Sequence, residues 1–237
     1  MLPLTFESTS AMTILTPGPL KTDAATGLSY RLMQPQPNSA RRCLVLLHGV
    51  GSNELSVASL AQGVTDDTLV VLAQGPLTLG PQQFAWFQVA FTSSGPRIDS
   101  EQAERSRLAL VQLLAELQQQ FGVLPEQTVI AGFSQGGIVS ASVALTSPES
   151  VAGFGLLSGR ILPEIEPFLA SKERLSNLKG FLGHGEYDSK LPVDWAYRAH
   201  EWLDKLDVTH TLSLYPIDHS ISEQMHADFL GWWTQLG

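Results

Sequence analysis

Ser134 lies at the centre of the most informative motif in the sequence. It stands in Gly132-Phe-Ser-Gln-Gly136, after a continuously apolar run and before a stretch of small residues. The G-x-S-x-G spacing is typical of a tight strand-to-helix turn that presents a serine hydroxyl for nucleophilic attack. The alternative is a glycine turn with an incidental serine, but the strand pattern before the motif and the helix pattern after it favour the nucleophile.

A serine hydroxyl is a weak nucleophile unless a neighbouring base takes its proton. His219 is the predicted base, because it lies in a loop between the last predicted strand and the last predicted helix. Three other histidines lie inside predicted helices or at a strand start, where a packed or exposed side chain is the simpler interpretation: His200, His210 and His226. His184 lies in a glycine turn, which we expect it to shape.

The base in turn needs an acid that orients its ring. In the α/β enzymes that use the G-x-S-x-G turn, the chain order is serine, acid, histidine. Asp188 follows a short apolar run and a glycine turn, and is the predicted acid; Glu186, in the same turn, is the alternative. Asp218 is too close to His219 in the sequence to support its ring.

A second glycine turn, Leu46-Leu-His-Gly-Val-Gly-Ser52, follows another buried-strand pattern. In acyl transfer, backbone N–H groups stabilise the negative oxygen that forms when the serine attacks. One N–H comes from the residue after the serine and one from an earlier loop. This pattern predicts an oxyanion hole made by Gln135 and Val50, with simple turn geometry as the alternative for the earlier loop.

The segment Gly75–Gly95 holds four aromatic residues, Phe84, Trp86, Phe87 and Phe91. Two interpretations fit them equally well. They form one wall of an acyl-binding site, with Trp86 and Phe87 in contact with the substrate, or they anchor the loop to the core.

These side chains require a scaffold, and the sequence predicts one from Leu28 onward. The predicted strands are Leu28–Met33, Cys43–Leu47, Thr68–Ala73, Thr128–Gly132, Val151–Leu157, Gly180–Gly183 and Thr211–Tyr215. The predicted helices are Leu55–Ala61, Ser100–Phe121 (with Ser100 as its cap), Gln135–Leu145, Val193–Leu206 and Ser220–Leu236. This alternation predicts an α/β fold, with a mostly parallel central sheet and helices on both faces.

The length of 237 residues fits one domain over 1–237, in which residues 1–27 form an N-terminal edge strand or extension. About 20 residues separate the strand ending at Leu157 from the one beginning at Gly180. A large cap domain does not fit there. We therefore expect an open, shallow site that favours small or extended acyl groups.

Composition excludes several classes of function. The formal net charge of −9, without a dense basic run, argues against nucleic acid as a partner. The single cysteine, Cys43, rules out an intrachain disulfide and a cysteine-based metal cluster, and we predict no metal. The apolar runs are too short for stable membrane insertion and no signal peptide is evident, so we expect a cytoplasmic protein.

Taken together, these blocks resemble the phospholipase/carboxylesterase family of α/β-hydrolases, which includes acyl-protein thioesterases. The matching segments, in family order, are Leu47–Gly51, Ala85–Phe87, Gly132–Gly137, Leu157–Gly159, His184–Asp188 and His219. Two positions depart from the family pattern: Gln88 stands where Asp is usual, and Leu191 stands where Val is usual. A particular substrate is therefore not implied.

The resemblance implies an α/β-hydrolase fold, a Ser134–Asp188–His219 triad, and no metal or organic cofactor. It also implies hydrolysis of carboxylic esters or thioesters, often by a homodimer. We expect a serine carboxylesterase that acts on small to medium acyl esters through an acyl-enzyme intermediate. The alternatives are an acyl thioesterase or lysophospholipase, and a non-catalytic ligand-binding protein on the same fold.

Overall fold

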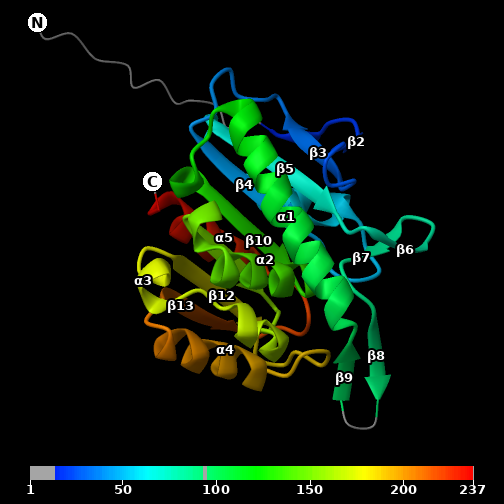
Figure 1. Ribbon diagram of the computed structural model, residues 1–237, viewed down its shortest axis with the longest axis vertical. Coiled ribbons are helices and arrows are strands. Elements are labelled where there is room, and N and C mark those ends of the chain that lie inside the picture. The colour runs from blue at the N-terminus through cyan, green and yellow to red at the C-terminus, as the bar shows by residue number, and fades with distance from the viewer. Residues whose placement is uncertain (1–13, 93–94, 237) are drawn as a thin grey trace, which may run out of the picture.

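The computed structural model describes residues 14–92 and 95–236, which are built around a nine-stranded sheet (Figure 1). In sheet order the strands are β1 (Thr16–Pro17), β3 (Ser29–Gln34), β5 (Thr68–Gln74), β4 (Arg42–Leu47), β10 (Thr128–Phe133), β11 (Gly153–Leu157), β12 (Lys179–Gly185) and β13 (Thr209–Tyr215). The ninth strand, β2 (Lys21–Thr22), also pairs with β3.

The sheet is parallel from β5 to β13 and antiparallel only at the β3 edge. The predicted mostly parallel sheet is therefore confirmed, and each of the seven predicted strands has a counterpart. The edge pairing expected before residue 28 is present as β1 and β2, both antiparallel to β3. Residues 1–13 of the expected N-terminal extension lie outside the described residues.

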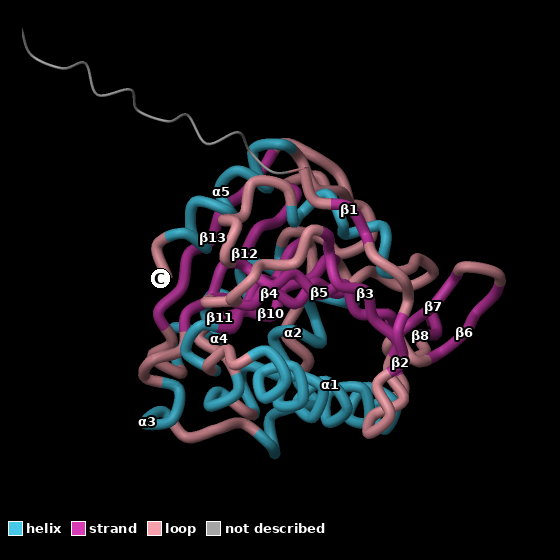
Figure 2. Tube along the Cα trace, turned by 90° about the horizontal axis from the view of Figure 1, so that it is seen from above, coloured by secondary structure: helices cyan, strands magenta, loops and turns pink. Residues whose placement is uncertain are grey.

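Helices cover both faces of the sheet (Figure 2). One face carries α1 (Ser100–Phe121), α2 (Gln135–Thr146), α3 (Lys172–Leu175) and α4 (Asp194–Lys205), and the other carries η1 (Glu54–Ala61) and α5 (Glu223–Thr234). Three further short 3₁₀ segments are η2 (Pro125–Gln127), η3 (Pro148–Ser150) and η4 (Pro163–Phe168). The segment predicted as a helix at Leu55–Ala61 is a 3₁₀-helix, which suits its short length.

Alternation along the central strands divides the core into two layers. In β4, Val45 and Leu47 pack on the side of α1 and α2, whereas Leu44 and Leu46 pack on the side of η1 and α5. All four side chains are fully buried. A parallel strand with helices on both faces needs such a continuous apolar run, and this is why the run was readable in the sequence.

The ends of α1 are set by its neighbours in the sequence. The Asp99 carboxylate, rather than the predicted Ser100, caps the first turn by accepting a hydrogen bond from the Gln102 N–H. Gly122 ends the helix in the left-handed conformation, with φ of 68°.

The long segment between β5 and α1 is more ordered than its loop-like sequence suggests. It forms two antiparallel hairpins, β6 (Leu77–Gly80) with β7 (Gln83–Ala85), and β8 (Val89–Thr92) with β9 (Gly95–Ile98). Between β11 and β12 there is only η4 and α3, so the expected absence of a large cap agrees with the described chain. No helix of residues 14–92 and 95–236 is long and apolar enough to cross a membrane.

Candidate active site

Ser134 forms the turn between β10 and α2, in a conformation that a strand or helix residue does not adopt. Its φ of 54° and ψ of −118° are strained for a residue with a side chain. The flanking glycines explain how the turn closes. A Cβ atom on Gly132 would lie 2.6 Å from the Leu47 carbonyl oxygen, and a Cβ on Gly136 would overlap the same carbonyl. Strand β4 therefore packs directly against the turn, as the G-x-S-x-G motif predicts.

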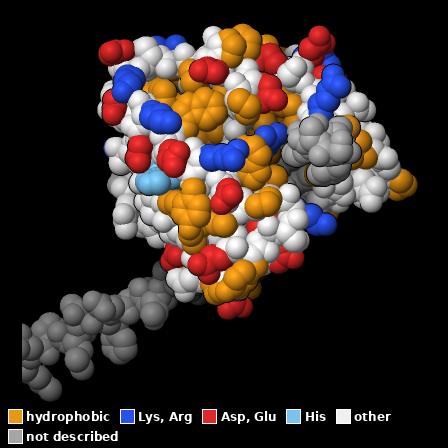
Figure 3. Space-filling view, turned by 90° about the horizontal axis from the view of Figure 1, so that it is seen from below, with side chains coloured by type: hydrophobic (Ala, Val, Ile, Leu, Met, Phe, Trp, Pro, Cys, Tyr) orange, Lys and Arg blue, Asp and Glu red, His pale blue; other side chains and the backbone are white. Residues whose placement is uncertain are grey.

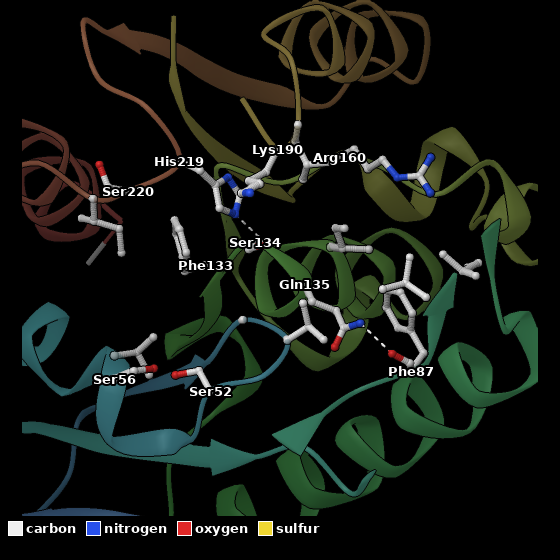
Figure 4. A pocket seen from close by; sticks show the side chains of 18 of the residues that line it. Ser52, Ser56, Phe87, Phe133, Ser134, Gln135, Arg160, Lys190, His219 and Ser220 are labelled. Carbon is white, nitrogen blue, oxygen red and sulfur yellow. Dashed lines mark hydrogen bonds between the residues drawn. The ribbon is translucent and has the colours of Figure 1, made fainter. Parts of the chain in front are cut away.

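The structure brings Ser134, His219 and Asp188 together. His219 Nε2 lies 3.0 Å from Ser134 Oγ (Figure 4). On the other side of the ring, His219 Nδ1 lies 2.7 Å from Asp188 Oδ2. Because an ionised carboxylate can only accept, Nδ1 carries the proton and the Nε2 lone pair faces the serine hydroxyl. The ring of Phe133 packs against His219, with centroids 4.8 Å apart.

Asp188 is held firmly on the side away from the serine. Its side chain is fully buried, and Oδ1 accepts hydrogen bonds from the Lys190 and Leu191 N–H groups. Glu186, the alternative acid, points into solvent and makes no hydrogen bond to His219. The structure therefore brings Asp188, and not Glu186, to the histidine.

Asp218 and His184 support the two loops instead. The Asp218 carboxylate accepts hydrogen bonds from the Ser189 and His219 N–H groups, which lower the pKa of Asp218 and tie the two loops together. Buried His184 donates from Nε2 to the Leu191 carbonyl. Burial lowers the pKa of His184, which favours its neutral form. His184 thus shapes the acid's turn, as the sequence indicated.

Two backbone N–H groups beside Ser134 have no acceptor among the described residues. They belong to Val50 and to Gln135, the residues predicted for the oxyanion hole, and both residues line the same cavity as Ser134. The loop before Val50 is fixed by hydrogen bonds from Gly51 N to Phe84 O and from Phe84 N to Ser52 O, each 2.8 Å long.

His48 fixes this loop from below, a role that the sequence alone did not assign. Its Nδ1 donates to the Gly49 carbonyl, and its Nε2 accepts the Gly75 N–H at 2.9 Å. The ring is fully buried, and burial lowers the pKa of His48. A neutral imidazole with this tautomer satisfies both contacts. In the sequence, only its position next to the Gly-Val-Gly turn indicated that His48 supports this loop.

The side chain of Gln135 connects the serine turn to the aromatic segment. Its Oε1 accepts the Trp86 N–H and its Nε2 donates to the Phe87 carbonyl, both at 2.7 Å. Ser106 of α1 donates to the Trp86 carbonyl from the other side. The Gln135 backbone is therefore held in place by its own side chain.

Trp86 itself does not reach the cavity, which corrects the prediction that it contacts substrate. Its ring is fully buried, and its Nε1 donates to the His48 carbonyl at 3.0 Å. Trp86 anchors the segment, whereas Phe87 lines the cavity. The anchoring interpretation therefore applies to Trp86, and the cavity-wall interpretation applies to Phe87. The side chain of Phe91 lies outside the described residues.

A cavity of about 660 Å³ opens above Ser134 (Figure 4). Its apolar lining includes Val50, Val57, Phe87, Val89, Ile98, Phe133, Ile138, Leu191 and Ile221. Its basic lining consists of Arg160 and Lys190, on the same side of Ser134 as His219, while Ser52 and Ser56 lie on the opposite side. The sequence motifs predicted a role for neither Arg160 nor Lys190. The only sequence features that link them to the site are the position of Arg160 after β11 and that of Lys190 two residues after Asp188.

The face of the molecule seen from below is chemically mixed. Hydrophobic side chains gather there beside basic and acidic groups (Figure 3). This face includes the β8–β9 hairpin, which projects at the bottom of the ribbon view.

One group in the described part of the chain has the residue types of a metal site. His200, Asp204 and His210 place one ligand atom each within 4.8 Å of one another. His210 lies near the start of β13, about 17 Å from Tyr215 at ~3.3 Å per residue, whereas His219 lies in the loop beyond the other end of that strand. A cation at this cluster would not touch Ser134.

The chain is similar in sequence to known acyl-protein thioesterases. The chain is 28% identical over 206 residues to acyl-protein thioesterase 1 of Eremothecium gossypii, covering 81% of this chain and 86% of that protein. It is 26% identical over 179 residues to acyl-protein thioesterase 1 of Kluyveromyces lactis, covering 70% and 78% respectively.

Solved structures share the fold. The carboxylesterase from Mesorhizobium loti superposes with a TM-score of 0.78 at 22% identity, covering 91% of this chain and 98% of that one. Esterase PE8 gives a TM-score of 0.77 at 24% identity, covering 89% and 99%. This likeness identifies the architecture as the α/β-hydrolase fold. The family model described as Phospholipase/Carboxylesterase matches residues 30–232, so the chain belongs to the phospholipase/carboxylesterase family.

Proposed function

We propose that this protein is a serine carboxylesterase that cleaves small to medium acyl esters through an acyl-enzyme intermediate. The observation that carries the proposal is the continuous hydrogen-bonded chain from Asp188 through His219 to Ser134. Membership of a family with carboxylesterase and thioesterase relatives supports the same reaction class.

In the proposed first step, Ser134 Oγ attacks the acyl carbonyl carbon while His219 Nε2 takes the hydroxyl proton. The negative charge that develops on the carbonyl oxygen is stabilised by the N–H groups of Val50 and Gln135. His219 then donates its proton to the leaving oxygen, and the ester bond breaks. The product of this step is an ester between the acyl group and Ser134.

In the second step a water molecule takes the place of the leaving group. His219 removes a proton from the water as its oxygen attacks the acyl carbon. The tetrahedral intermediate collapses, Ser134 regains its proton from His219, and the acid departs. Throughout the cycle, Asp188 keeps the ring oriented and stabilises its positively charged form.

The apolar lining of the cavity suits a small to medium acyl chain. Side chains from η1, the β8–β9 hairpin and α2 contribute to it, and its volume is in the usual range for a small-molecule site. A thioester is the second candidate substrate, because the relatives from E. gossypii and K. lactis are named acyl-protein thioesterases. The acyl chemistry is common to both substrates.

The test is the hydrolysis of p-nitrophenyl acetate, butyrate and octanoate by the wild type and by Ser134→Ala. We expect turnover by the wild type and a loss on the order of 10⁴-fold or more in kcat for the variant. Matched oxygen and sulfur esters of the preferred acyl chain then compare esterase with thioesterase activity. If both proteins are equally inactive on all of these substrates, either the substrate is of another kind or the fold serves binding, and the esterase proposal is withdrawn.

A further inference from the structure

Arg160 has an unusual environment in this cavity. It follows β11, and the residue is only 6% exposed, yet it lines the same cavity as Ser134. Its guanidinium lies over the ring of Trp195 in α4, 4.7 Å from the ring centroid. It makes no hydrogen bond or ion pair within residues 14–92 and 95–236.

A buried guanidinium without a partner is costly, because it carries five N–H donors and keeps its charge at any physiological pH. Burial lowers the pKa of Arg160, and the nearby Glu164 opposes this without reaching ion-pair distance. The guanidinium nitrogens are not completely shielded from solvent. Because Arg160 also lines the cavity, a ligand bound there can meet these donors.

The remaining charge in the cavity has the same sign. Lys190 is its second basic residue, and among the described residues no Asp or Glu side chain lines the cavity. This is notable in a chain whose formal net charge is −9. Arg160 and Lys190 both lie on the His219 side of Ser134 (Figure 4). The cavity thus combines a largely apolar lining with two cationic side chains.

We propose that the preferred substrate is an acyl ester that also carries an anionic group, a carboxylate or a phosphate, which pairs with Arg160. This proposal rests on the esterase function proposed above and names its substrate class. A guanidinium can bind either group through two parallel hydrogen bonds. Lys190, which is exposed at the rim, adds attraction without a fixed geometry.

The anionic group has two possible sources, the acyl part or the leaving group, and matched substrates separate them. On the acyl side, the monoanionic p-nitrophenyl glutarate is compared with its uncharged isostere, p-nitrophenyl 5-methylhexanoate. On the leaving-group side, 4-acetoxybenzoate is compared with its methyl ester. The quantity measured is the ratio of kcat/KM for the anionic member of a pair to that for the neutral member.

We expect Arg160→Met to lower this ratio about 10- to 100-fold in one of the two pairs, the range of a charge-assisted hydrogen bond. The pair that responds shows where the anion lies. Methionine retains an apolar stem beside Trp195, and circular dichroism checks the fold. Arg160→Lys retains the positive charge but not the two parallel N–H donors of the guanidinium. Its ratio should lie between those of the wild type and Arg160→Met.

Arg198 offers a matched control. Its guanidinium lies over the same Trp195 ring, 4.9 Å from the centroid, but Arg198 does not line the cavity. Arg198→Met should leave both ratios unchanged. The proposal is overturned if Arg160→Met leaves both ratios at the wild-type value, or if Arg198→Met changes them as much.

Failure of the esterase function would look different. In that case neither member of either pair would be hydrolysed above the level of Ser134→Ala. The anion site can still be tested by titrating the protein with glutarate and measuring the chemical-shift changes in protein NMR spectra. Glutarate should bind the wild type more tightly than Arg160→Met; equal binding would refute the site itself.

Discussion

At the scale of single residues, the proposed chemistry depends on which nitrogen of His219 carries the proton. Asp188 fixes this, because its Oδ2 accepts the Nδ1 hydrogen at 2.7 Å while Oδ1 is already occupied by two backbone N–H groups. The carboxylate cannot turn away without losing both bonds. His219 therefore presents a lone pair to Ser134 in the resting protein.

Asp188→Asn tests this orientation with little change of shape. The amide oxygen can still accept from the Lys190 and Leu191 N–H groups, but the amide nitrogen then faces His219 Nδ1 and favours the wrong tautomer. We expect kcat on p-nitrophenyl butyrate to fall about 10³- to 10⁴-fold with little loss of stability. Glu186→Gln, in the same turn, should stay within about twofold. A similar loss in both variants would contradict the assignment of the acid.

At the scale of the elements, the site is assembled from the carboxyl ends of parallel strands. Ser134 follows β10, Val50 follows β4, Asp188 follows β12 and His219 follows β13. These four strands run in the same direction, so their ends meet at one edge of the sheet. The turn at Ser134 needs the closest packing, since β4 and α2 approach each other there through Gly136.

Gly136→Ala should therefore be severely destabilising. Its Cβ would overlap the Leu47 carbonyl, which belongs to a central strand and cannot move aside easily. We expect a loss of about 3 kcal/mol or more in the free energy of unfolding, measured by urea denaturation. Gly231→Ala in α5 is the control, because nothing lies within 4 Å of its added Cβ. That change should stabilise the protein by up to ~1 kcal/mol, and equal losses would contradict the packing argument.

The sequence predicted the central strands and α1 because periodicity and continuous apolar runs are local signals. It predicted Ser134, Asp188 and His219 because each follows a predicted strand. It did not separate Trp86 from Phe87, because both are buried in the bend between β7 and β8, and tertiary contacts such as the hydrogen bond from Trp86 to the His48 carbonyl decide which of them reaches the cavity. Arg160 was missed for a similar reason: its burial comes from Trp195, far along the chain.

At the scale of the whole molecule, two buried histidines make stability depend on pH. Burial holds the pKa values of His48 and His184 below the ordinary 6.5, so both are neutral in the folded protein. In the unfolded chain each binds a proton as the pH falls through about 6.5. The unfolded state then binds more protons than the folded state, and the free energy of unfolding decreases as the pH falls.

We expect the free energy of unfolding to decline between pH 7 and pH 5.5, as measured by urea denaturation. His184→Gln should flatten this decline, because the amide can still donate to the Leu191 carbonyl but does not titrate. The difference in slope should be on the order of 1 kcal/mol per pH unit at most. An unchanged slope in the variant would contradict the lowered pKa of His184 in the folded protein.

The central claim, that Ser134 is an activated nucleophile, is tested most directly by covalent labelling. The protein is treated with a fluorophosphonate, which reacts with activated serines, and intact mass and peptide mapping locate the adduct. We predict one adduct per chain, on Ser134, with no labelling of Ser134→Ala and much slower labelling of Asp188→Asn. Labelling of another serine, or no labelling of the wild type under conditions that label a known serine esterase, would contradict the claim.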